Sequence, residues 1–317
     1  AQIPDLLPWL LDALTQDGLA VERAGAAQGL AEVLCALGDD KLRAMLPELR
    51  EAAAVGGRDF QGSRGQAGAD AIAREGYAML WVHLPAVFGP RFEPFLPEVL
   101  PLVLHGLADD AEPVRDASMR AAQAAIGAFR EAAAALMLPP LQQGLCDPNY
   151  RIRQSSAELV GELMLGLTGR EAMALVEAGG ENAADSPLAG VPVEQQHSLL
   201  AALYIARSDD ALGVKQAAHF VWKTLVPNAP KALRIILKEL TRQIVSGLSS
   251  EDEDVQGAAA RALGELVSKL ASRVLPTLIP ILQAGLADDG THDEAHRQGV
   301  CLGLAELMGA AGREAIT

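Results

Sequence analysis

Apolar residues recur every three or four positions over most of the chain, which is the spacing of one face of an α-helix. One such segment contains, in order, Leu96, Val99, Leu100, Val103 and Leu107. A second amphipathic segment, rich in alanine, follows it after a short polar turn. Because this order of segments recurs along the chain, the pattern predicts an all-α fold built from pairs of helices.

The dipeptide Gly-Leu marks a repeat of these helix pairs. Gly144-Leu145 follows Gly106-Leu107 after 38 residues, and the same interval separates Gly285-Leu286 from Gly247-Leu248. The pentapeptide GLADD contains this dipeptide at 106–110 and again at 285–289. A period near 40 residues is typical of helical solenoids. We therefore predict one continuous stack over residues 1–317, with about seven units at 1–38, 39–89, 90–130, 131–193, 194–230, 231–272 and 273–317.

The repeating unit resembles the HEAT repeat. The shared features are the Leu-Leu-Pro openings of the first helices, an aspartate in the turn, and a basic residue beside a β-branched one at the start of the second helix. Examples of the last feature are Val114 with Arg115, and Ile152 with Arg153. The resemblance implies a right-handed α-solenoid of HEAT (armadillo-like) helix pairs. Prolines in the first helices are expected to bend these helices or to mark where they begin.

The acidic turns have a structural interpretation. We expect the glycine of Gly-Leu to let the first helix end, and the aspartates to cap the second helix by accepting hydrogen bonds from its free N–H groups. The expected turn caps are Asp110, Asp147, Asp210 and Asp289. The basic residue that follows each turn is expected to pair with an aspartate of its own or the neighbouring unit, which would form a ladder along the stack.

Two insertions interrupt the repeat and are predicted to be loops. The first, at 55–69, is rich in glycine and carries Arg58 and Arg64, while the second spans 177–192. Both arginines are candidate partner contacts, and simple variation of a surface loop is the alternative. Neither end of the chain shows a polar terminal repeat, so we expect an internal segment of a longer protein.

The charge balance limits the partners. The chain has 26 Lys and Arg against 41 Asp and Glu, a formal charge of −15, which disfavours broad binding to nucleic acid or anionic membranes. One basic stripe stands against this trend: Lys231, Arg234, Lys238 and Arg242 share one face of a predicted helix, and Lys223 lies just upstream. The stripe is a candidate contact for phosphates or an acidic partner segment, and an ordinary solvated helix face is the alternative.

No motif of catalysis or cofactor binding is found in the sequence, so we predict neither an enzyme nor a metal or cofactor site. The segment HDEAH at 292–296 has aspartate where a zinc protease motif needs glutamate. Three widely spaced cysteines, Cys35, Cys146 and Cys301, are interpreted as reduced core thiols. No apolar run reaches the roughly 20 residues that cross a bilayer.

Several stretches resemble the large general-control-nonderepressible family of HEAT-repeat translational activators, called ILITYHIA in plants. They are ERAGAAQGLAEVL at 22–34, YRIRQSSAELVGELM at 150–164, LAALYIARSDD at 200–210, VKQAAHFVWKTLV at 214–226 and RQGVCLGLAELM at 297–308. The resemblance covers nearly the whole chain, apart from the two insertions.

That family implies a cytoplasmic scaffold bound to ribosomes and ribosomal proteins, which activates the kinase of the alpha subunit of translation initiation factor two when amino acids are scarce or ribosomes collide. The kinase is engaged through the full-length protein, nucleic-acid contact is limited, and no membrane is involved. No single kinase-contacting residue carries over to this sequence.

Two other classes of helical repeat protein remain as alternatives. Tubulin-binding TOG arrays place basic residues on their turns, whereas the turns here carry aspartates such as Asp109, Asp209 and Asp288. A nuclear transport receptor is the third alternative, although the N-terminus lacks that family's signature.

Overall fold

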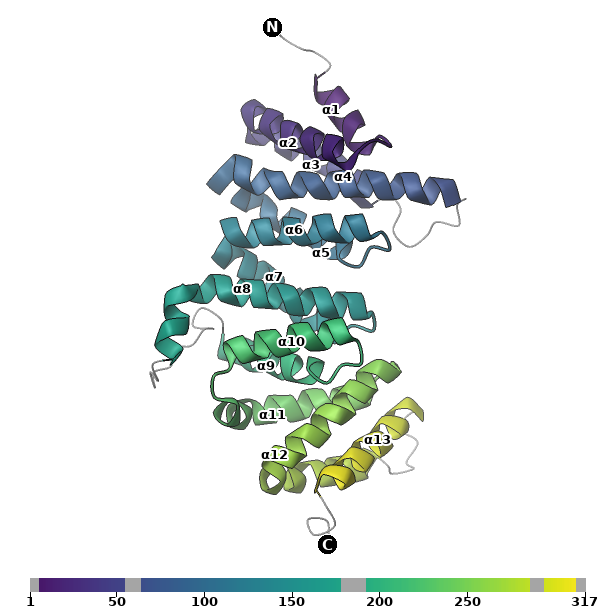
Figure 1. Ribbon diagram of the computed structural model, residues 1–317, viewed down its shortest axis with the longest axis vertical. Coiled ribbons are helices and arrows are strands. Elements are labelled where there is room, and N and C mark those ends of the chain that lie inside the picture. The colour runs from purple at the N-terminus through teal and green to yellow at the C-terminus, as the bar shows by residue number, and fades with distance from the viewer. Residues whose placement is uncertain (1–5, 55–63, 178–191, 286–293, 312–317) are drawn as a thin grey trace. The chain divides into compact units, whose positions relative to one another are not determined.

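The computed structural model describes residues 6–54, 64–177, 192–285 and 294–311 (Figure 1). Within these ranges all regular structure is helical, which confirms the predicted all-α class. The helices form two compact units, residues 1–138 and 139–317, and each is described by itself. The continuous seven-repeat stack therefore stays a prediction.

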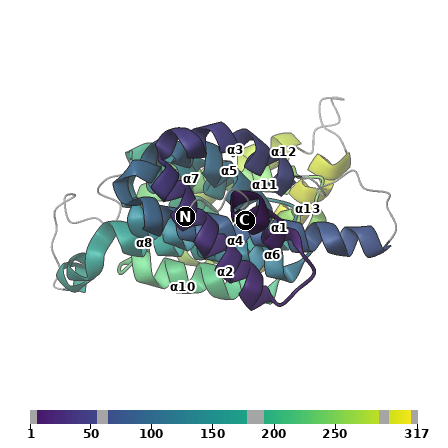
Figure 2. The same ribbon diagram turned by 90° about the horizontal axis from the view of Figure 1, so that it is seen from above.

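The first unit consists of helix pairs in two layers. Its elements are α1 (Leu6–Thr15), α2 (Ala20–Leu37), α3 (Asp39–Ala54), α4 (Arg64–Phe88), the 3-10 helix η1 (Gly89–Phe95), α5 (Leu96–Gly106), α6 (Glu112–Ala128) and the start of α7 (Arg130–Gly144). The second helices α2, α4 and α6 lie side by side in one layer, and α3 and α5 lie behind them (Figures 1 and 2). The apolar face of each helix is buried between the layers, as the fully buried Leu14, Leu30, Leu80 and Phe92 show.

The second unit repeats this arrangement. After the end of α7 it contains α8 (Tyr150–Glu177), α9 (Val193–Ala206), α10 (Leu212–Leu225), α11 (Ala229–Leu248), α12 (Glu253–Gly285) and α13 (Glu294–Ala311). The packed neighbours α8 and α10 form one layer, and α9 packs on α11 in the other. Leu270 has non-helical angles (φ −137°, ψ 30°), so α12 is two successive helices that meet close to the predicted repeat boundary at 272/273.

Two expectations from the sequence need correction. The predicted loop at 55–69 is too long at its C-terminal end, because α4 already begins at Arg64; residues 55–63, with Arg58, lie outside the described part of the chain. The cysteines are free thiols as expected, but they are not core residues, since Cys146 and Cys301 are exposed and Cys35 is half-buried. The small side chains of the core are supplied by alanines instead.

The glycine of Gly-Leu does not act as a left-handed helix cap. Within the described residues only Gly38 and Gly89 have positive φ. A Cβ atom on Gly106 would instead lie 2.1 Å from Oγ of Ser118 in the paired helix, and Gly144 faces Ser156 in the same way at 2.2 Å. These glycines are needed because the two helices of a repeat approach each other closely where the turn begins.

A second kind of glycine contact joins neighbouring repeats. A Cβ atom on Gly76 in α4 would lie 2.1 Å from the backbone oxygen of Leu14, and one on Gly299 in α13 would lie 1.5 Å from the oxygen of Leu248. Leu14 and Leu248 occupy the same place in their repeats, at the end of the first helix. Since a backbone oxygen cannot rotate away, a larger residue at either glycine would push two repeats apart.

We expect Gly76→Ala and Gly299→Ala each to lower the free energy of unfolding by about 1–3 kcal/mol, the cost of overpacking a well-packed interface. Gly127→Ala is the matched control, because its Cβ would meet nothing within 4 Å near the end of α6; alanine there should be neutral or stabilising. Urea unfolding followed by circular dichroism measures all three, and equal effects at the three positions would contradict the close-approach argument.

Candidate functional site

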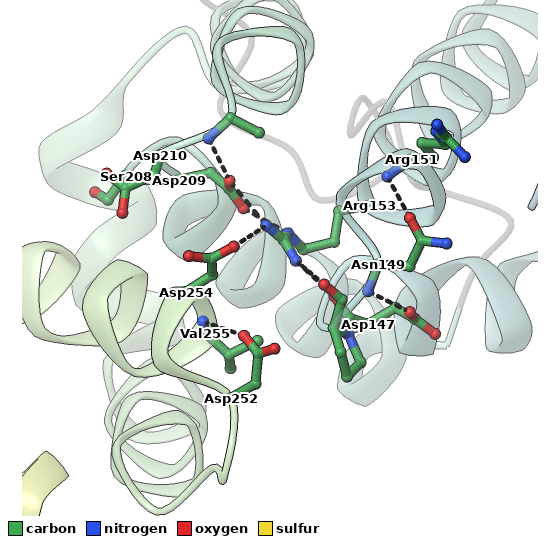
Figure 3. Close-up of polar contacts among 12 residues, drawn as sticks. Asp147, Asn149, Arg151, Arg153, Ser208, Asp209, Asp210, Asp252, Asp254 and Val255 are labelled. Carbon is green, nitrogen blue, oxygen red and sulfur yellow. Dashed lines mark hydrogen bonds and ion pairs between the residues drawn. The ribbon is translucent and has the colours of Figure 1, made fainter.

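The turns of the second unit are organised around the guanidinium of Arg153 (Figure 3). Its Nε donates to Oδ2 of Asp209 at 2.6 Å, and its Nη2 donates to Oδ1 of the same carboxylate at 3.1 Å. Nη1 donates to the backbone oxygens of Asp147 and Pro148, both at 2.8 Å. The side chains of Arg153 and Asp209 are both 3% exposed. Arg153 therefore closes the turn of its own repeat and binds the turn of the next one.

The first unit contains the same two contacts on different arginines. Arg115 closes its own turn by donating from Nη1 to the backbone oxygens of Asp109 and Asp110, at 2.7 and 2.9 Å. Arg74 in α4 binds the Asp109 carboxylate with two hydrogen bonds of 2.6 and 3.0 Å. Each unit thus contains an arginine that binds an aspartate of the next turn, Arg74 in the first unit and Arg153 in the second. In the sixth predicted repeat Gln256 replaces the arginine and donates to the backbone oxygen of Ser250.

Two of the acidic turns carry a pair of aspartates, and the first aspartate of each pair contacts the backbone of its turn. In the pairs Asp109-Asp110 and Asp209-Asp210 it is the first aspartate whose Oδ1 accepts from the backbone N–H two residues later, at 2.9 Å in both turns. The turn contact is thus shown for Asp109 and Asp209, and a capping role for Asp110 and Asp210 stays a prediction. The Asp210 carboxylate lies 3.0 Å from Nη2 of Arg261.

The geometry explains why the first aspartate makes this contact. An aspartate side chain is the right length to accept from the N–H two positions ahead, and the second residue of each pair stands too close to that N–H. Asp147, which is followed by proline, makes the same contact with the N–H of Asn149 at 2.8 Å. Asp289 lies outside the described residues.

A cation-π cluster around Arg207 was missed in the sequence. The guanidinium carbon lies 4.8 Å from the ring centre of Tyr204 and 5.3 Å from that of Trp222, and Nη2 donates to Oε1 of Glu265 at 3.0 Å. The available signal was the replacement of Gly-Leu by Ala-Arg at 206–207, which puts an arginine where other turns have a buried leucine. The aromatic rings and the carboxylate satisfy the cation at that place.

The predicted basic stripe lies on α11, and we call Lys231, Arg234, Lys238 and Arg242 the α11 basic face. All four side chains are exposed, while Leu233, Ile236, Leu240 and Ile244 on the opposite side of the helix are buried. Lys223 is also exposed, but it belongs to the last turn of α10 in the other layer of the unit. The structure thus places four of the five predicted cations on one surface.

A polar network holds α11 against its neighbours. Ser198 of α9 accepts from Nε2 of Gln142 in α7 at 2.6 Å and from Nε2 of Gln243 in α11 at 2.8 Å, and it donates to Oε1 of Glu239 at 2.9 Å. Arg242 donates to both oxygens of Glu239, at 2.8 and 2.5 Å. The Arg242 hydrogen bonds, with those from Gln243 and Ser198, lower the pKa of Glu239 from 4.5 to about 2. Arg242 is therefore neutralised by a neighbour on its own helix.

The remaining candidate positions add little chemistry. Arg64 stands at the first position of α4. His296, the described histidine of HDEAH, lies with Nδ1 2.7 Å from Oγ of Ser249. No cluster of three or more possible metal ligands occurs among the residues described here. None of the described helices is both long and apolar enough to span a bilayer.

Comparison with known proteins identifies one family description and several relatives. The description "EF3 N-terminal HEAT repeat" matches residues 23–165. The chain is 40% identical to the human "Stalled ribosome sensor GCN1" over 98% of its own length, and 36% identical to the yeast (Saccharomyces cerevisiae) "eIF-2-alpha kinase activator GCN1" over 100%. It is 41% identical to the Arabidopsis thaliana "Protein ILITYHIA" over 86% of its length. The match covers only 11%, 11% and 10% of these three relatives.

Importin beta is one of the solved structures to which this chain is similar. The similarity has a TM-score of 0.36 and 15% sequence identity, and it covers 96% of this chain and 43% of that structure.

We expect Arg153→Ala to lower the free energy of unfolding by about 3–5 kcal/mol, because it leaves the buried Asp209 carboxylate without its partner. Arg50→Ala is the control, since its 3.2 Å pair with Glu98 is about half exposed on both sides and should contribute less than about 1 kcal/mol. Urea unfolding measures both variants. A loss for Arg153→Ala no larger than for Arg50→Ala would refute the linking role of Arg153.

We expect the contribution of Glu239 to stability to depend on pH. Its pKa is lowered in the folded state to about 2, so the stabilisation is present above the unfolded pKa near 4.5 and is lost as the pH falls towards 2. Glu239→Gln should therefore lower the midpoint of thermal unfolding at pH 7, and its difference from the unmodified chain should shrink between about pH 4.5 and pH 2. Differential scanning calorimetry across this pH range measures both midpoints. A difference between the two midpoints that does not change with pH would contradict the lowered pKa of Glu239.

Proposed function

Because the chain belongs to the family of GCN1 and ILITYHIA proteins, we propose that it is a non-catalytic scaffold segment of a ribosome-bound regulator. That regulator would activate the kinase of translation initiation factor two alpha during amino-acid starvation or ribosome collision. The observation that carries the proposal is the 36–41% identity over 86–100% of the chain. The matched relatives are named as a ribosome sensor and as a kinase activator.

The chain spans 11% of the length of the human and yeast relatives. The activities of these relatives are therefore proposed for this chain. A scaffold role agrees with the way each unit is built. The helices are joined by turn contacts within and between repeats, and the polar groups at the turns are engaged by one another. Stacks of this kind present long surfaces to partners. The kinase would be engaged through the full-length protein, in the cytoplasm.

The α11 basic face is the proposed contact with the ribosome. The chain carries a formal charge of −15, so most of its surface would be repelled by ribosomal RNA, and nucleic-acid contact would be limited to this face. Lys231, Arg234 and Lys238 are exposed and make no ion pair within the described part of the chain. They are free to contact a negatively charged partner without first breaking an internal bond.

We expect the triple variant K231E/R234E/K238E to bind ribosomes about ten-fold more weakly at low salt, because three attractive charges become repulsive. Co-sedimentation with purified ribosomes measures the change, and circular dichroism checks that the helices are intact. The control is K41E/R120E/R130E, which makes the same change of charge at three exposed cations of the first unit. Equal co-sedimentation of the two triple variants would exclude the α11 basic face as the contact.

A further inference from the structure

We infer that the α11 basic face binds an acidic segment of a partner protein that also places an apolar side chain on Ile235. This inference rests on the proposed function only in taking the same face as a contact surface, and it names the class of partner. The alternative occupant, the phosphate backbone of RNA, is an outcome of the test below.

Ile235 occupies the centre of the exposed ridge. Lys231, Ile235, Lys238 and Arg242 are separated by four, three and four residues, so they form one line along the helix. Ile235 is 54% exposed, whereas Leu233, Ile236 and Leu240 of the same helix are buried. With a rise of about 1.5 Å per residue, Lys231 and Lys238 stand about 10 Å apart on either side of it. The surface is therefore an apolar spot between two cations.

Few of the cations on the α11 basic face are available to a partner. Arg242 is bound to Glu239 by two hydrogen bonds, which leaves Lys231, Arg234 and Lys238 as the cations without an ion pair in the described structure. Nucleic-acid binding draws most of its affinity from neutralising many phosphates. A face with three such cations suits a short acidic segment better than a long polyphosphate chain.

The apolar spot favours the same choice. A phosphate backbone offers nothing apolar to cover Ile235, so the side chain would stay in water and contribute no affinity. A peptide with an apolar residue between acidic ones would bury Ile235 and pair with the cations at once. The two contributions come from adjacent turns of one rigid helix.

The face is held in place before any partner binds. Gln243 donates to the backbone oxygen and to Oγ of Ser198, at 3.0 and 2.8 Å, which fixes the C-terminal half of α11 against α9. The first turn is fixed by Asn228, whose Oδ1 accepts from the backbone N–H of Lys231 at 3.0 Å. A partner would therefore not have to order the helix, and even a small surface could give measurable affinity.

The test uses the purified chain and three fluorescent probes. The first is a helical peptide of about 20 residues with glutamates two turns apart and a leucine between them, matched to the spacing of Lys231 and Lys238. The second is the same peptide with the leucine replaced by serine. The third is a polyuridylate of about 20 nucleotides. Fluorescence anisotropy at low salt gives each dissociation constant.

We expect the leucine peptide to bind the unmodified chain, and K231E/R234E/K238E to abolish this binding. Ile235→Ser should weaken it about five-fold, as removal of part of a buried apolar side chain predicts. The serine peptide should bind the unmodified chain about as weakly as the leucine peptide binds Ile235→Ser. Its dissociation constant should be the same for the unmodified chain and for Ile235→Ser. Glu239→Gln, which releases Arg242, should bind the leucine peptide more tightly.

Three results would overturn the inference: no binding of the leucine peptide, an affinity unchanged by Ile235→Ser, or tighter binding of polyuridylate that depends on the three cations but not on Ile235. Failure of ribosome co-sedimentation with intact peptide binding would refute the proposed ribosome contact alone. Co-sedimentation that is lost in K231E/R234E/K238E but unchanged in Ile235→Ser would support the ribosome contact and overturn the acidic-segment inference.

Discussion

The structure depends on a buried guanidinium at the start of a second helix. Arg153 donates to two backbone oxygens of its own turn and to both carboxylate oxygens of Asp209 in the next repeat. A buried arginine is tolerated only where its donors find acceptors in a fixed geometry. The turn therefore has to adopt one conformation, and the next repeat has to dock in one register. Apolar packing between helices supplies most of the stabilisation, but it could be satisfied by several registers.

This constraint also explains where the acidic residues of the chain are placed. Asp109 and Asp209 each bind the backbone of a turn and an arginine of a neighbouring helix, so these two carboxylates serve the architecture of the chain. The cations of the α11 basic face lie instead on the outward face of a helix. This separation allows one helix, α11, to carry cations on a chain that is acidic overall, because the turn contacts do not depend on what the outer face displays.

Much of the fold followed from the sequence because helix periodicity and repeat spacing report on contacts that recur. The pairing of Arg153 with a neighbouring aspartate was predictable for the same reason. The choice between Asp109 and Asp110 was not, because both residues have the same chemistry and only the backbone path shows which carboxylate reaches the N–H of Ala111. The first helix of this repeat does end at Gly106, but the reason was misread, because a glycine needed for close packing and one needed for positive φ look alike in a sequence.

The α11 basic face shows a further limit of reasoning from spacing alone. Four cations at intervals of three and four residues predict a shared face, and the structure places all four on the exposed side. The spacing does not reveal that Glu239, three residues before Arg242, is held by Ser198 and Gln243 in the orientation that binds this arginine. A single polar contact between two helices thus removes one cation from the surface. The remaining three surround Ile235, and the chemistry of the face becomes that of a mixed apolar and basic patch rather than a uniform phosphate-binding stripe.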